Sequence, residues 1–90
     1  MALTKAIPQM NPLFRLQFEQ AQNCHVLLYP EGMVKLNDSA AEILKKVDGH
    51  NSVDQILTLL QQQFPQVGDI RDDIDEFLTV AQEKKWIRYV

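Results

Sequence analysis

The sequence is poor in the residue types that catalytic and metal centres need. Its 90 residues include one cysteine, two histidines and three glycines. The glycines are isolated at 32, 49 and 68, so no glycine-rich loop is available to hold a phosphate. The histidines fall in different predicted elements and have no partners at metal-ligand spacing. We therefore expect no catalytic constellation, no metal site and no cofactor in this chain.

The single cysteine, Cys24, restricts the chemistry further. It cannot form an internal disulfide, which is typical of a protein kept in a reducing, cytoplasmic compartment. As a nucleophile it would need a neighbouring base and an oxyanion hole, and the sequence marks neither. An enzyme or redox protein that uses Cys24 stays an alternative, but we predict a half-buried or edge thiol.

The charge balance disfavours polyanionic partners. The chain carries 12 acidic and 9 basic residues, a formal net charge of −3, which weakens any attraction to nucleic acid or anionic membranes. No segment approaches the ~20 apolar residues of a membrane span. The first residues also lack the continuous apolar run of a signal peptide. We expect a cytoplasmic protein with neither nucleic acid nor a membrane as its partner.

Hydropathy divides the chain into an arm and one folded domain. Residues 1–12 contain two prolines and no periodicity, so we predict a flexible N-terminal arm there and a single domain over residues 13–90. Three short runs with the pattern of strands follow, at 14–18, 25–29 and 33–36. Because a Pro-Glu-Gly turn joins the last two runs, they favour a hairpin.

The rest of the chain has the period of α-helices. Either Asn37 or the pair Ser39 and Glu42 can cap a first helix, which we expect to end at Gly49. A second helix follows the capping-box pair Ser52 and Gln55. A third begins at Asp69, and the apolar segment 86–90 adds a small strand or packs on the core. The order predicts an α+β, winged-helix-like fold, a three-stranded antiparallel β-meander followed by a three-helix bundle.

Winged helices often read DNA with their third helix, so a transcriptional regulator is a second candidate. The third helix of this chain argues against it, because five acidic residues and one arginine occupy residues 69–76. Such a first turn stabilises a helix N-terminus but repels phosphate. We therefore expect this helix to be well capped and not to contact DNA.

The last strand of the meander raises a more specific hypothesis. Its outer edge has unpaired backbone groups unless something covers them, and a short strand with a lysine is also the usual defence against edge pairing. The alternative is β-augmentation, in which an extended peptide adds as a fourth strand. The third helix then forms the opposite wall, and we favour its flank on the side of Leu78. The predicted peptide-binding residues are Met33, Val34, Lys35, Leu36, Arg71, Asp75, Leu78 and Gln82.

The segments VLLYPEGMVKLNDSAAEILKKVDGHNSVDQIL (26–57), DDIDEFL (72–78) and KKWI (84–87) resemble the PqqD family. The resemblance covers roughly residues 12–88. It implies a peptide chaperone of pyrroloquinoline quinone biosynthesis that docks the precursor peptide PqqA along the third strand. It further implies delivery to the radical S-adenosylmethionine enzyme PqqE, which cross-links a glutamate and a tyrosine of the peptide.

Two further alternatives follow from the resemblance and from the open edge. Related domains serve other modified-peptide pathways, so a recognition element of a different pathway is possible. An exposed strand also permits exchange between two copies, so we expect either a monomer or a strand-exchanged dimer.

Overall fold

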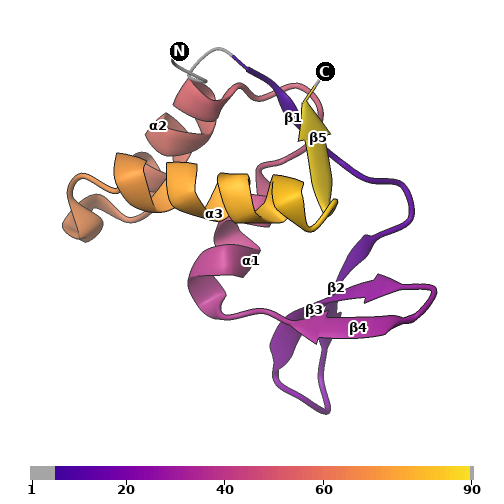
Figure 1. The fold of residues 1–90 in the computed structure, drawn as a ribbon. Coiled ribbons are helices and arrows are strands. Elements are labelled where there is room, and N and C mark those ends of the chain that lie inside the picture. The colour runs from indigo at the N-terminus through magenta and orange to yellow at the C-terminus, as the bar shows by residue number, and fades with distance from the viewer. Residues whose placement is uncertain (1–5, 90) are drawn as a thin grey trace.

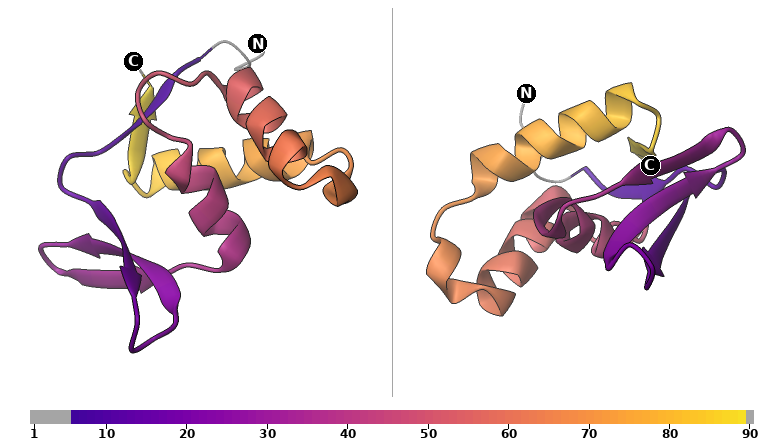
Figure 2. Two further views of the ribbon diagram at one scale, coloured as in Figure 1. Left: turned by 180° about the vertical axis from the view of Figure 1, so that it is seen from behind. Right: turned by 90° about the horizontal axis from the view of Figure 1, so that it is seen from below.

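The computed structural model describes residues 6–89 of the chain, which form two small sheets and three α-helices (Figure 1). The three-stranded sheet projects from one end of the helices, and α3 crosses in front of α1 (Figures 1 and 2). The elements are β1 (Pro8–Met10), β2 (Arg15–Glu19), β3 (Cys24–Tyr29), β4 (Gly32–Lys35), α1 (Asp38–Lys45), α2 (Val53–Gln63), the 3₁₀ helix η1 (Pro65–Val67), α3 (Arg71–Glu83) and β5 (Ile87–Tyr89).

The predicted meander is confirmed as an antiparallel sheet in the order β2-β3-β4. Leu27 of the central strand lies between Leu16 and Val34 in register and is fully buried. The first hairpin turns through Asn23, whose φ of 54° lies in the left-handed region that asparagine tolerates. Gly32, with φ of 153°, closes the second hairpin in a conformation that favours glycine.

The structure decides between the two predicted caps of α1. The Asn37 side chain accepts a hydrogen bond from the Ala40 amide at 2.8 Å, so Asn37 is the N-cap. Glu42 instead accepts from the Lys45 ammonium group at 3.0 Å, and no Ser39–Glu42 capping box forms. The helix ends at Lys45, before Gly49, because the Lys46 amide bonds back to the Ile43 carbonyl.

The starts of the other two helices differ: α2 has a side-chain cap, whereas the N-cap of α3, Ile70, makes no side-chain hydrogen bond, so the expectation that the third helix is well capped is wrong. Ser52 and Gln55 make both hydrogen bonds of the predicted capping box at the start of α2. α3 begins at Arg71, two residues after the predicted start. Asp69 lies just outside the helix, where its carboxylate accepts from the Arg71 amide at 3.1 Å.

The expectation of a flexible arm over residues 1–12 is corrected for its described part. Residues 8–10 form β1, which pairs antiparallel with β5. The Asn11 amide donates to the Trp86 carbonyl at 2.9 Å, and the Val53 amide donates to the Ala6 carbonyl at 2.9 Å. The first five residues lie outside the described part of the chain. Backbone hydrogen bonds therefore hold the segment 6–11 against both the C-terminal strand and the start of α2. These bonds join residues far apart in the sequence, so local sequence patterns could not predict them.

One hydrophobic core joins the sheet to the helices. Ile56, Ile74, Leu78 and Ala81 are at most 1% exposed, and Trp86 is 9% exposed. The N-terminal strand adds Met10 to the margin of this core. The packing fixes α3 across α1, with β4 to one side (Figure 1), and this position creates the site described next.

Candidate functional site

The outer edge of β4 has no strand partner in the described part of the chain. The Leu36 amide donates to the His25 carbonyl at 2.9 Å, so Leu36 faces the neighbouring strand. Backbone groups of an antiparallel strand alternate between its two sides. The N–H and C=O groups of Met33 and Lys35 therefore point to the open side, and those of Val34 point to β3. Two donors and two acceptors stand along this edge.

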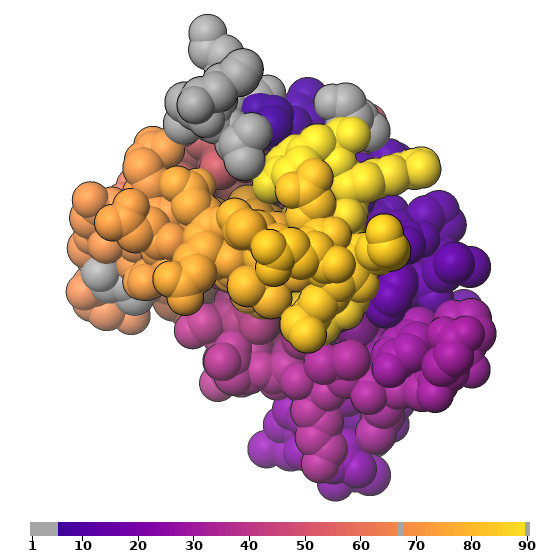
Figure 3. Space-filling view, viewed as in Figure 1, coloured from indigo at the N-terminus to yellow at the C-terminus, as the bar shows by residue number. Residues whose placement is uncertain are grey.

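A channel of about 300 Å³ lies beside this edge, between the end of β4, the start of α1 and one flank of α3. In Figure 3 this boundary runs along the lower side of α3, above α1 and β4. The channel is lined by Lys35, Leu36, Asn37, Ser39, Ala40, Ile43, Asp73, Phe77 and Trp86. Its aromatic wall is the pair Phe77 and Trp86, whose ring centroids lie 6.4 Å apart. An apolar side chain that enters the channel would meet these rings next to the open strand.

The structure brings only part of the predicted site together. Lys35 and Leu36 line the channel, and Met33 and Val34 precede them on the same strand. Met33 is 44% exposed, whereas Val34 packs against the core. The four predicted residues of α3, in contrast, do not line the channel.

Each of those α3 residues has a different neighbourhood. Arg71 donates to the Asp54 carboxylate of α2 at 3.0 Å, and Leu78 is 1% exposed within the core. Burial raises the pKa of the Tyr89 phenol above its ordinary value, and the nearby Asp75 carboxylate adds to the rise. Asp75 therefore lies towards β5. Arg71 and Asp75 therefore have neighbours in α2 and β5, and the peptide-binding role of Arg71, Asp75, Leu78 and Gln82 stays a prediction.

The opposite flank of α3 supplies two channel residues that were not among the predicted peptide-binding residues. Phe77 is half-buried and lines the channel, and Asp73 lines it one turn earlier in the helix. The amphipathic period marks both margins of the buried stripe equally, so it carries no signal that selects one of them. Trp86 is buried as expected, and it also forms part of the channel wall.

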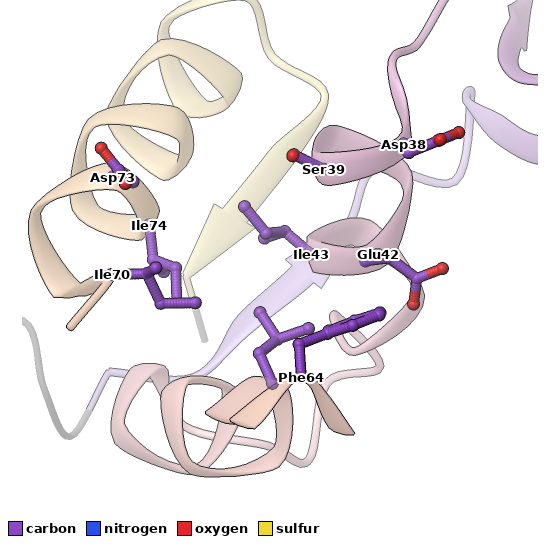
Figure 4. Close-up of a pocket in the computed structure, with 9 residues that line it drawn as sticks. Asp38, Ser39, Glu42, Ile43, Phe64, Ile70, Asp73 and Ile74 are labelled. Carbon is purple, nitrogen blue, oxygen red and sulfur yellow. The ribbon is translucent and has the colours of Figure 1, made fainter. Parts of the chain in front are cut away.

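A second hollow of about 230 Å³ opens next to the channel, among α1, the end of α2 and the start of α3. It is lined by Asp38, Ser39, Glu42, Ile43, Leu60, Phe64, Ile70, Asp73 and Ile74. Figure 4 shows the isoleucines and Phe64 around the central space, whereas the carboxylates of Asp38, Glu42 and Asp73 point away from it, Asp73 on the opposite side from the other two. The two hollows have Ser39, Ile43 and Asp73 in common, so they are adjacent parts of one depression.

Elsewhere in residues 6–89 the structure offers little chemistry. No cluster of three or more His, Cys, Asp or Glu side chains suits a metal ion among the described residues. Cys24 is a half-buried free thiol, and His25 contacts the Phe18 ring edge-on at 5.1 Å between centroids. No helix in this described part is long and apolar enough to cross a membrane.

The chain matches one protein family along most of its length. The family model described as Coenzyme PQQ synthesis protein D (PqqD) matches residues 24–87. A PqqA binding protein of Azotobacter vinelandii is 59% identical over 81 residues, which cover 90% of this chain and 88% of the relative. A PqqA binding protein of Pseudomonas aeruginosa is 57% identical over 82 residues, which cover 91% of this chain and 89% of the relative.

Solved structures agree with this assignment. The solution NMR structure of the PqqD truncation of Methylobacterium extorquens PqqCD has a TM-score of 0.75 and 34% identity, covering 97% of this chain and 93% of that one. It is described as a functional, stand-alone recognition element for ribosomally synthesised and post-translationally modified peptides. The heterocyclase TruD shares the fold, with a TM-score of 0.70 and 24% identity over 94% of this chain and 12% of that one. The α+β fold and the sequence together establish that the chain belongs to the PqqD family.

Proposed function

We propose that this chain is a non-catalytic peptide chaperone that binds the precursor peptide PqqA as an additional strand on β4. The observation that carries the proposal is the unpaired outer edge of β4 beside an apolar channel. The names of the relatives, PqqA binding protein, support the same partner. The peptide's main chain pairs with Met33 and Lys35, and its side chains enter the channel between β4 and the Asp73–Phe77 flank of α3.

The energetics require both the ladder and the channel. The two donors and two acceptors at the edge contribute about 4 kcal/mol in total, at ~1 kcal/mol net for each hydrogen bond. Micromolar affinity corresponds to about 8 kcal/mol. At ~25 cal/mol per Å² the difference equals roughly 160 Å² of buried apolar surface, about one aromatic side chain. Because association also costs several kcal/mol of lost freedom, the peptide must bury more than this minimum.

The chaperone role has a second half, in which the bound peptide is presented to the radical S-adenosylmethionine enzyme PqqE. β-augmentation holds the peptide extended on one face of a small domain, so residues beyond the bound strand stay accessible to an enzyme. The cofactors of the reaction belong to that enzyme. Formation of the glutamate–tyrosine cross-link in PqqA by PqqE should therefore be faster with this chain present than without it.

The test of peptide binding is a titration of ¹⁵N-labelled chain with synthetic PqqA, and in parallel with duplex DNA, at moderate salt. We expect amide shifts in residues 33–36 and around Asp73 and Phe77 with the peptide, and none with DNA. The acidic first turn of α3, which repels phosphate, is the reason for the second expectation. Shifts confined to Arg71, Asp75 and Gln82, or a response to DNA alone, would contradict the proposal.

A further inference from the structure

The hollow among the three helices is separate from the β4 edge and has the size of a side-chain pocket. Ile70, Ile74, Leu60 and Phe64 line this hollow but not the channel. Its volume of about 230 Å³ exceeds that of the cavities of about 150 Å³, lined by Leu, Ile and Phe, that bind benzene. A leucine, isoleucine or phenylalanine side chain therefore fits. Phe64 and Ile70 are only partly buried, so apolar surface is left for a ligand to cover.

The charged side chains that line this hollow are all negative. Asp38, Glu42 and Asp73 contribute carboxylates, and no lysine, arginine or histidine lines the hollow. Glu42 is already occupied by the Lys45 ammonium group at 3.0 Å and by the Gln63 amide at 3.3 Å. Within the described residues no cation lies within 4.0 Å of the Asp38 or Asp73 carboxylate. The rim is therefore complementary to a lysine or arginine of a ligand.

The hollow lies where a peptide strand on β4 would lead. The chain runs from β4 through Leu36 and Asn37 directly into α1, and the shared residues Ser39, Ile43 and Asp73 join the channel to the hollow. An extended peptide advances ~3.3 Å per residue. A few residues beyond the paired strand therefore span the shared part and bring a side chain to Ile70 and Ile74.

We propose that this hollow is a second anchor pocket of the peptide groove, which takes one Leu-, Ile- or Phe-sized side chain of the precursor peptide with a lysine or arginine next to it. The apolar side chain packs on Ile70, Ile74 and Phe64, and the cation lies outside the hollow, against Asp38 at the start of α1 (Figure 4). The pocket rests on the proposed function, since the same peptide fills both compartments. It adds a sequence requirement to the peptide, outside the segment that pairs with β4.

Isoleucine methyl groups report on the pocket directly. The chain has isoleucines at positions 7, 43, 56, 70, 74 and 87, and a ¹³C-methyl label on isoleucine distinguishes the compartments. With synthetic PqqA, we expect the Ile70 and Ile74 methyl signals to shift and to show NOEs to one apolar side chain of the peptide. The Ile56 methyl, fully buried in the core, is an internal control that should not move.

Two pairs of variants test the pocket through affinity. Ile70→Trp fills the hollow and should weaken PqqA binding about tenfold or more, as expected when one large apolar side chain is excluded. Leu59→Trp, at a 37% exposed position of α2 outside the groove, should change it less than about twofold. Asp38→Asn should weaken PqqA binding about two- to fivefold at low salt. The control is Asp72→Asn, which should leave the affinity unchanged, because Asp72 lies in the first turn of α3 but does not line the hollow.

The outcomes separate this inference from the proposed function. If the amides of residues 33–36 respond to PqqA but the Ile70 and Ile74 methyls do not, the anchor pocket is wrong and the strand site stands. If neither responds, both are wrong. If the Ile70 methyl shifts with protein concentration in the absence of peptide, a second copy of the chain fills the hollow and the inference is overturned. Equal affinities of the Ile70→Trp and Leu59→Trp variants would also overturn it.

Discussion

Replacing Lys35 with proline separates the main-chain role of β4 from its side-chain role. Alternation along the strand places the Lys35 N–H on the open side, because the Leu36 amide donates to His25 at 2.9 Å. Proline removes this donor without breaking a hydrogen bond of the free protein. Edge strands tolerate proline when the missing N–H faces solvent, so the free energy of unfolding should change by less than about 1 kcal/mol.

The effect on peptide binding should be much larger. The peptide carbonyl that would pair with this N–H is left buried without a donor, which costs about 1–3 kcal/mol, instead of the ~1 kcal/mol net gain of an intact hydrogen bond. This cost of about 1–3 kcal/mol corresponds to roughly 5- to 150-fold weaker binding. Lys35→Ala keeps the N–H and loses only the exposed side chain, so it should bind within about threefold of the parent chain.

The assay is fluorescence anisotropy with labelled PqqA, together with urea unfolding of each variant. Val34→Pro serves as the opposite control, because the Val34 N–H faces β3 and its loss should destabilise the fold. If Lys35→Pro and Lys35→Ala bind the peptide equally well while both remain folded, the main chain of β4 does not pair with the peptide and the reasoning is refuted.

Three further predictions concern the groove, a cap and a loop. Phe77→Ala should weaken PqqA binding about tenfold through lost apolar burial. Arg71→Ala should leave the affinity within about twofold, because Arg71 faces Asp54 of α2. Equal losses of affinity in a peptide titration would show that the peptide binds along the Arg71 flank of α3 instead. Ser52→Ala removes the capping box of α2 and should lower the free energy of unfolding by about 1 kcal/mol in urea, with Thr58→Ala, an exposed site on the same helix, as the control that should change it less. The backbone amides of Asn51 and His50 hold the pKa of the Asp48 carboxyl below its ordinary value of 3.8. The ionised carboxylate therefore stabilises the fold above pH 3.8, and this stabilisation is lost as the pH falls through the lower pKa of the folded state. Asp48→Asn should flatten that part of an acid-unfolding curve, and an unchanged curve would contradict the assignment.

Local patterns were enough to predict most of the elements. Alternation and turn residues located the meander, and side-chain caps located α2, because these signals act within a few residues of one another. The choice between Asn37 and the Ser39–Glu42 pair needed the structure. Both patterns are good caps in isolation, and Glu42 forms its hydrogen bonds with Lys45 and Gln63 instead.

Long-range placement could not be read from the sequence. Strand β1 exists because residues 8–10 meet residues 87–89, and nothing near Pro8 signals a partner at the other end of the chain. The flank of α3 that lines the groove could not be chosen from the sequence for a related reason. Phe77 sits at the margin of the apolar stripe, where a residue can belong to the core or to the groove wall, and only the docking of α3 across α1, next to the end of β4, decides between them.

Hydrogen exchange along β4 tests the central claim most directly, which is that this strand's outer ladder is incomplete until a peptide fills it. In the free protein we predict protected amides at Val34 and Leu36, which face β3, and fast exchange at Met33 and Lys35. Saturating PqqA should then slow exchange at Met33 and Lys35 specifically. Protection of these two amides before any peptide is added, or no change in them once the peptide is bound, would contradict the account.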